Sequence, residues 1–73
     1  MKVKYREFEL EAYRDKSITG IKLIFYSIFR ISDQRDFDSG FSYSDETIRS
    51  FIKDMKSQVD DLYENPEHYD FKW

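Results

Sequence analysis

The 73-residue sequence contains no cysteine, one histidine, one proline and two glycines. Without cysteine, the chain has no disulfide framework, no thiolate zinc site and no cysteine nucleophile. The single histidine, His68, follows a proline closely and is a poor candidate for the base of a catalytic triad, and one histidine cannot form a cluster of metal ligands. We therefore expect a protein that is not an enzyme and that needs no metal or other cofactor.

The sequence also lacks a long apolar run. Its longest, residues 23–28 with a serine inside it, is far shorter than the roughly 20 residues that span a bilayer. The first residues carry charges at short intervals and no apolar stretch follows them, which is unlike a signal peptide. We expect a cytoplasmic protein with no membrane partner, folded as a single domain over residues 1–73.

Charged residues are abundant, at 37% of the chain, but their signs are unevenly distributed. The formal net charge of −3 is the sum of +3 over residues 1–30 and −6 over residues 31–73. Such an asymmetry indicates either a charged surface for a partner or two halves that neutralise each other within the fold. The acidic balance also disfavours direct binding to nucleic acid.

Three segments have the pattern of β-strands. Apolar and polar residues alternate over residues 3–13 and 36–43, which is typical of half-buried strands. Residues 21–31 are rich in β-branched and aromatic side chains and predict a strand that is apolar on both faces. With short connections between them, these segments predict a three-stranded antiparallel β-meander.

The pattern changes at Ser44, a good N-cap residue. Apolar side chains then recur at steps of three and four, which predicts an amphipathic helix over residues 45–64. Asn65 and Pro66 end this helix, and an aromatic tail over residues 65–73 follows. The expected fold class is α+β, with three antiparallel strands followed by one C-terminal amphipathic helix (βββα).

Matching of apolar residues predicts how the first two strands pair. A register that places Leu10 opposite Leu23 brings large apolar side chains together and turns the odd-numbered residues of the middle strand toward the helix, with Phe25 and Phe29 among them. In the third strand, the same reasoning places Phe37, Phe41 and Tyr43 on the helix side. One helix covers one face only, so the even-numbered residues of the middle strand form an outer face.

This outer face is the first candidate binding surface. Its apolar centre consists of Ile24, Tyr26 and Ile28, and charged residues surround it, as at a protein interface. One strand neighbour contributes Glu7, Glu9 and Glu11 to the charged rim. In an alternative interpretation, the tail folds back over this face through Tyr69, Phe71 or Trp73 and leaves nothing for a partner.

A second candidate surface is acidic. Asp60, Asp61 and Glu64 lie near the helix C-terminus, where the helix dipole disfavours anions, so a basic partner is one explanation for their position. A solvated helix end that keeps the protein soluble is the other. The candidate partner-binding residues are therefore Glu7, Glu9, Glu11, Ile24, Tyr26, Ile28, Asp60, Asp61 and Glu64.

The layout resembles small phage-encoded accessory proteins, including anti-CRISPR proteins. The resemblance rests on size, on the βββα order, and on residues 8–12, 26–30 and 60–64. It implies a non-catalytic inhibitor that occludes a surface of a host defence protein, with a basic nucleic-acid-binding protein as one such partner. Those proteins share no sequence motif, so the resemblance assigns no site residue.

Two further functions remain open from the sequence. One is a structural homodimer that pairs the outer sheet faces of two copies. The other is a sheet that binds single-stranded nucleic acid by stacking bases on Tyr13 and Tyr26 near basic residues. Carboxylates on the same face would repel a phosphate backbone, which places this function behind protein binding.

Overall fold

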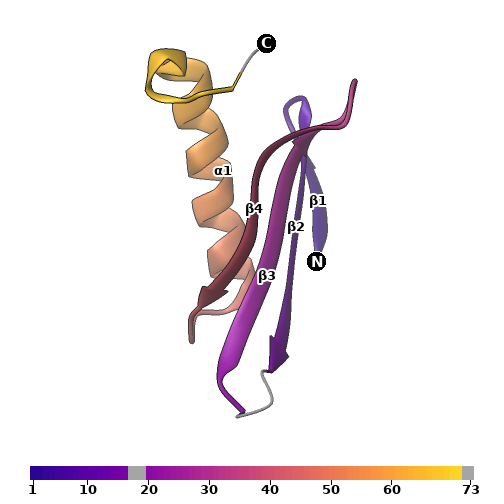
Figure 1. Ribbon diagram of the computed structural model, residues 1–73, viewed down its shortest axis with the longest axis vertical. Helices are drawn as coiled ribbons and strands as arrows, with labels where there is room; N and C mark the ends of the chain where they lie inside the picture. Colours follow the sequence, from indigo (N-terminus) through magenta and orange to yellow (C-terminus); the bar gives the residue numbers. More distant parts are fainter. Residues whose placement is uncertain (17–19, 72–73) are drawn as a thin grey trace.

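The computed structural model describes residues 1–16 and 20–71, which form one antiparallel sheet and one long helix (Figure 1). Each strand pairs with its neighbours in the chain, in the order β1-β2-β3-β4. The α+β class, the antiparallel meander and the C-terminal helix are confirmed, but the sheet has four strands rather than three. The elements are β1 (Lys2–Tyr5), β2 (Phe8–Lys16), β3 (Lys22–Arg30), β4 (Arg35–Tyr43), the helix α1 (Ile48–Glu64) and the short 3₁₀ helix η1 (Pro66–His68).

The extra strand arises because a tight turn divides the predicted first strand. Tyr5 pairs with Phe8, and Arg6 between them adopts the left-handed backbone conformation, with φ of 55°. A non-glycine residue rarely takes this conformation, so the composition gave no turn signal. The positions of the apolar residues are consistent with a turn. Val3 is odd-numbered and Leu10 is even-numbered, yet both side chains pack on the helix side of the sheet. A single continuous strand would place them on opposite faces.

The register of β2 and β3 differs from the predicted one. Leu10 lies opposite Ile28, which is five positions along β3 from the predicted partner Leu23. A shift by an odd number of residues exchanges the two faces of a strand. The even-numbered residues of β3 therefore face the helix, and the prediction that Phe25 and Phe29 face it is wrong. Because both faces of β3 are apolar, matching of apolar residues could not distinguish the two registers.

A β-bulge sets the orientation of side chains along β4. Asp38 lies opposite Ile28 and Asp36 lies opposite Phe29, so Phe37 between them has no partner in the ladder. The extra residue lets Phe37 pack against the core as predicted. Beyond the bulge, Phe41 lies opposite Phe25 on the outer face, so its predicted position beside the helix is wrong.

The helix begins three residues later than predicted, at Ile48. Its N-cap is Thr47, whose Oγ1 accepts a hydrogen bond from the Ser50 amide at 3.0 Å. Ser44 instead accepts a hydrogen bond from the Glu46 amide at 3.2 Å within the preceding loop. The helix ends at Asn65 as predicted, and its predicted apolar stripe is the buried one, with Ile52, Met55, Val59 and Leu62 in the core.

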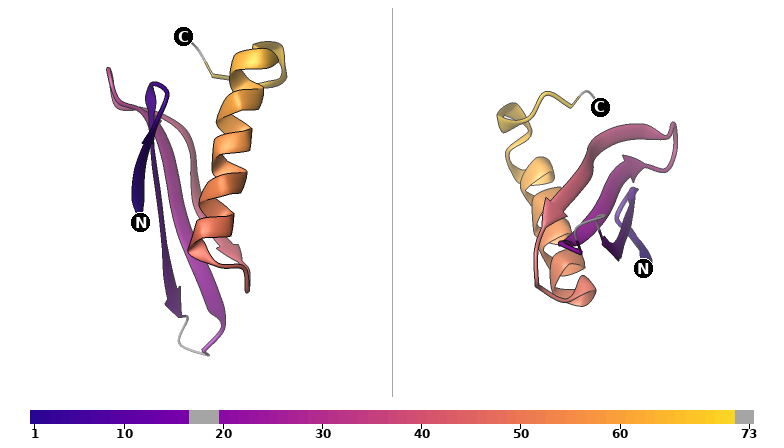
Figure 2. Two further views of the ribbon diagram at one scale, coloured as in Figure 1. Left: turned by 180° about the vertical axis from the view of Figure 1, so that it is seen from behind. Right: turned by 60° about the horizontal axis from the view of Figure 1, so that its bottom comes forward.

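The tail packs on the same side of the sheet as the helix. The ring centroid of Phe37 lies 5.3 Å from that of Tyr69 and 5.4 Å from that of Phe71. The alternative in which Tyr69 or Phe71 covers the outer face is therefore wrong, and Trp73 lies outside the described residues. Figures 1 and 2 show α1 on one face of the sheet and no other described element on the opposite face.

Candidate interaction surface

Four aromatic side chains form a continuous row across three strands on the uncovered face of the sheet. We call Tyr13, Phe25, Phe41 and Tyr43 the aromatic row. Tyr13 and Phe25 stack at 5.5 Å between ring centroids, Phe25 and Phe41 lie at 6.0 Å, and Phe41 meets Tyr43 edge to face at 5.8 Å. Large parts of these side chains remain in contact with water: Tyr13 is 49% exposed, Phe41 55% and Tyr43 67%.

Beside the aromatic row, the sheet has a shallow hollow of about 170 Å³. Tyr13 and Phe25 form its apolar side, and Glu11 and Ser27 supply polar side chains. A hollow of this kind can receive one side chain of a partner while the neighbouring rings cover its apolar part.

Charged residues of β1 and β2 border the other end of this face. The ammonium group of Lys2 lies 3.5 Å from the carboxylate of Glu11, and Lys4 is opposite Glu9 in the ladder. Glu9 and Glu11 thus lie on the outer face, as the sequence predicted. Glu7 does not, because it lies in the turn before β2 and accepts a hydrogen bond from the Tyr63 hydroxyl of the helix at 2.8 Å.

The predicted apolar centre of the outer face lies instead beneath the helix. Ile24 and Ile28 are fully buried, with no exposed surface, in the core formed with α1. Their assignment as partner-binding residues is therefore wrong, and the cause is the five-residue difference in register. An apolar outer face does exist, but the odd-numbered side chains form it.

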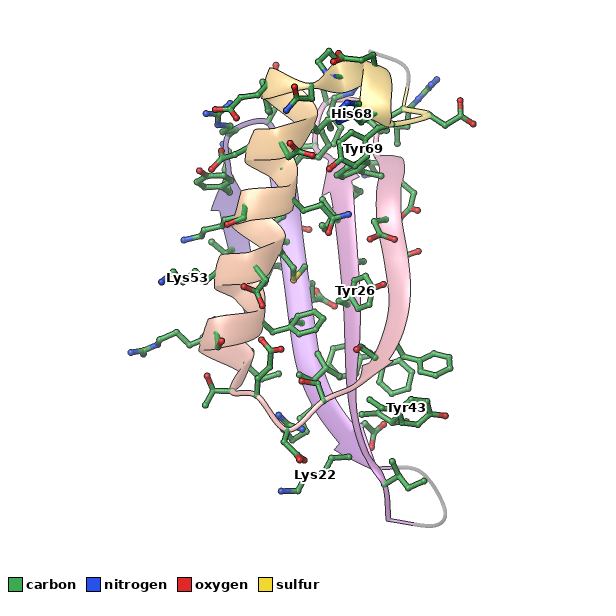
Figure 3. All side chains as sticks on the ribbon, turned by 90° about the vertical axis from the view of Figure 1, so that its left-hand side faces the viewer. Lys22, Tyr26, Tyr43, Lys53, His68 and Tyr69 are labelled. Atoms are coloured by element: carbon green, nitrogen blue, oxygen red, sulfur yellow. The ribbon has the colours of Figure 1, made fainter. Side chains whose placement is uncertain are left out.

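Tyr26 is also on the helix side, where Figure 3 shows it between α1 and β4. Its ring lies 5.4 Å from that of Phe51, and it lines a small hollow of about 150 Å³ together with Asp38 and Gln58. Burial, and secondly the charge of Asp38, raises the pKa of the Tyr26 hydroxyl. The ring of Tyr26 is therefore a half-buried wall of this hollow and packs on the helix side, although Tyr26 is also among the residues that line the hollow beside the aromatic row.

The acidic end of the helix is tied to the rest of the fold. The carboxylate of Asp60 accepts hydrogen bonds from the Tyr5 hydroxyl at 2.8 and 2.9 Å and lies 3.1 Å from Nε of Arg6. Asp61 accepts from the hydroxyl of Tyr69 and, at 2.9 Å, from the side-chain amide of Asn65.

These hydrogen bonds shift the pKa values of the groups that form them. The hydrogen bond from Tyr69, followed by that from Asn65, lowers the pKa of Asp61, and the bond to Asp60 raises the pKa of Tyr5. Two of the three carboxylates predicted to bind a partner thus stabilise the fold. Glu64, the third, is exposed.

The aromatic row is the feature that sequence reasoning missed. Its members are all odd-numbered, and the predictions that Phe25, Phe41 and Tyr43 lie against the helix are wrong. One signal was present: the even-numbered residues of β3 include Ile24 and Ile28, which are β-branched and aliphatic, as buried strand centres often are. Only the register could show which of the two apolar sets faces the helix.

The described residues contain no group of three or more histidine, aspartate or glutamate side chains placed to hold a metal ion. Within the same part of the chain, neither helix has the length and apolar character needed to cross a membrane. Comparisons of this chain with protein-family models, with curated proteins and with solved structures found no match.

Proposed function

We propose that this chain is a small, non-catalytic protein-interaction module that binds a partner protein through the outer face of its sheet. The observation that supports this most directly is the aromatic row, which is continuous, partly exposed and uncovered by any described element. Aromatic side chains are enriched at the centres of protein interfaces because they bury a large area at low cost in conformational entropy.

The charges on this face favour a protein over a nucleic acid. The hollow beside the aromatic row contains one carboxylate, that of Glu11, and no cation among its lining residues. Lys2 pairs with this carboxylate from outside the hollow, and within the hollow the carboxylate favours a basic side chain of a partner protein over a phosphate. The resemblance to phage accessory proteins extends the proposal to a host defence protein as the partner, and that identity stays a prediction.

A photo-crosslinking amino acid at position 43 tests the proposal in cells that express the protein. Tyr43 is 67% exposed within the aromatic row, whereas Ile31, 39% exposed in the turn between β3 and β4, provides a matched control position. We expect a discrete protein adduct from position 43, none from position 31, and loss of the adduct when Phe41→Asp is added. Equal adducts from both positions, or none from position 43, would contradict the proposal.

The same experiment distinguishes the other two candidate functions. A structural homodimer would give an adduct of twice the mass of the chain, and sedimentation would show a dimer that Phe41→Asp dissociates. A nucleic-acid adduct would be shortened by nuclease. Either result would replace the proposed function with that alternative.

A further inference from the structure

A second surface lies on the opposite side of the molecule from β4, between the first half of α1 and β1. It is an open groove of about 580 Å³. Val3 and Ile52 form its apolar floor, and Arg49, Lys53 and Lys56 line it with positive charge. No carboxylate is among the described residues that line the groove.

The three cations come from one side of the helix. Arg49 and Lys53 are four residues apart, and Lys56 follows three residues later, so their side chains form a stripe along α1. Lys56 is engaged with the Tyr5 ring, at 5.5 Å from its centroid. Neither Arg49 nor Lys53 forms an ion pair with a carboxylate of residues 1–16 or 20–71. Figure 3 shows Lys53 extending from the helix on the side of β1.

The strand beside this groove is at the edge of the sheet. β1 pairs with β2 alone among the described strands. Met1 and Ala12 exchange both main-chain hydrogen bonds, at 2.9 and 2.6 Å. Because bonded and non-bonded pairs alternate in an antiparallel ladder, the main-chain N–H and C=O groups of Lys2 and Lys4 point away from β2, toward the free edge.

We propose that this edge and groove bind an acidic peptide segment in extended form, which adds to the sheet as a fifth strand beside β1. The main-chain groups of Lys2 and Lys4 would pair with the added strand, as in other cases of β-strand addition. Carboxylates at alternate positions of that strand would face Arg49 and Lys53 across the groove, and the side chains between them would lie on the outer face beside Lys2 and Lys4.

Charge complementarity identifies the occupant. Lysines on an edge strand disfavour pairing with neutral or basic strands, which protects the edge from aggregation, but they favour a strand rich in carboxylates. A nucleic acid or an anionic membrane could satisfy the cations, yet neither supplies main-chain groups for the edge of β1. The site is separate from the aromatic row, so it does not depend on the function proposed for the outer face.

A blocked synthetic peptide in which glutamate and valine alternate provides the probe, with its lysine-for-glutamate counterpart as the negative control. We expect saturable binding of the acidic peptide only, weakened by at least about tenfold in Lys53→Glu. Lys22→Glu makes the same charge change at the start of β3, and we expect it to leave the Kd unchanged. No saturable binding, or equal weakening by both substitutions, would overturn the site.

The contribution of the strand edge is tested at position 4. Lys4→Ala and Lys4→Pro both remove the positive charge of Lys4. Only Lys4→Pro also removes the main-chain N–H that points toward the free edge, and an edge strand tolerates a proline at such a position. We expect Lys4→Pro to bind the acidic peptide at least about fivefold more weakly than Lys4→Ala, since a main-chain hydrogen bond contributes about 1 kcal/mol.

Amide hydrogen exchange gives a second measurement that needs no variant. The Lys2 and Lys4 amides of the unmodified protein should become protected when the acidic peptide binds. Unchanged exchange at both amides would overturn strand addition. Strand addition would also be overturned if a single-stranded oligonucleotide displaced the acidic peptide completely and the two position-4 variants bound that peptide with equal affinity.

Discussion

Tyr13 and Phe25 stack across β2 and β3 with their ring planes 17° apart, on the face of the sheet that the helix does not cover. Neighbouring strands hold both rings in place, so the aromatic surface exists before any partner arrives. A preformed surface loses little conformational entropy on binding, which leaves more of the contact energy for affinity.

The orientation of β3 predicts opposite outcomes for two apolar substitutions. Ile28 is fully buried, so Ile28→Ala should lower the free energy of unfolding by roughly 2–5 kcal/mol. Phe41 is 55% exposed, so Phe41→Ala should lower it by less than about 1 kcal/mol. Urea unfolding of the two variants measures both values. A larger loss for Phe41→Ala than for Ile28→Ala would show that the faces of the sheet are reversed.

The Tyr5 hydroxyl is expected to stabilise the contact between β1 and the helix. It donates to the Asp60 carboxylate at 2.8 and 2.9 Å, so Tyr5→Phe should cost about 1 kcal/mol of unfolding free energy. The matched control is Tyr43→Phe, because Tyr43 is 67% exposed and its ring packs only at the surface. Chemical denaturation should separate the two variants, and equal stability of both would remove Asp60 from the contacts that hold the fold.

Stability should fall in acid through Asp33. The Arg30 guanidinium donates to this carboxylate at 3.0 and 2.6 Å and lowers its pKa from the ordinary value of 3.8 to about 2. A pKa that is lower in the folded state adds stability above the pKa of the unfolded chain, and this contribution is lost as the pH falls through the folded value.

Asp33→Asn should therefore be less stable than the unmodified protein at neutral pH, and the difference should shrink between about pH 4 and pH 2. Unfolding by urea across this range measures it. Asp45→Asn replaces an exposed carboxylate in the loop before α1 and is the control, which should change the free energy of unfolding at neutral pH by less than Asp33→Asn does. A difference that stays constant with pH would mean that the Arg30 contact does not act through the charge of Asp33.

The position of the helix N-cap predicts a fourth pair of variants. Thr47→Ala removes the side-chain acceptor of the Ser50 amide and should cost about 1 kcal/mol. Ser44→Ala changes a hydrogen bond in the loop three residues before the cap and should cost less. Thermal unfolding followed by helical circular dichroism compares them, and a larger effect at Ser44 would restore the earlier helix start that the sequence predicts.

Local patterns in the sequence were sufficient to predict several elements of the fold. The apolar stripe from Ile52 to Leu62 has the helical period, and Pro66 ends the helix because the preceding residue disfavours helical dihedrals. Only one face of such a helix is apolar, so its buried side follows from the sequence alone. The α+β class follows in the same way from the change of period after the last strand.

The candidate site could not be predicted from the sequence to the same extent, because it depends on pairing between strands. Both faces of β3 are apolar, so Leu10 could be matched with Leu23 or with Ile28, and each choice gave a plausible core. The turn at Arg6 and the bulge at Phe37 shift the alternation of their strands without a glycine or proline to mark them.

The sequence by itself determined the helix, its buried stripe and the presence of a sheet with one uncovered face, because these depend on the period of neighbouring residues. Only the tertiary structure decided which side chains occupy that face. A one-residue change in register turns every side chain of a strand to the other side, so the position of the aromatic row was decided by turns, a bulge and packing against α1.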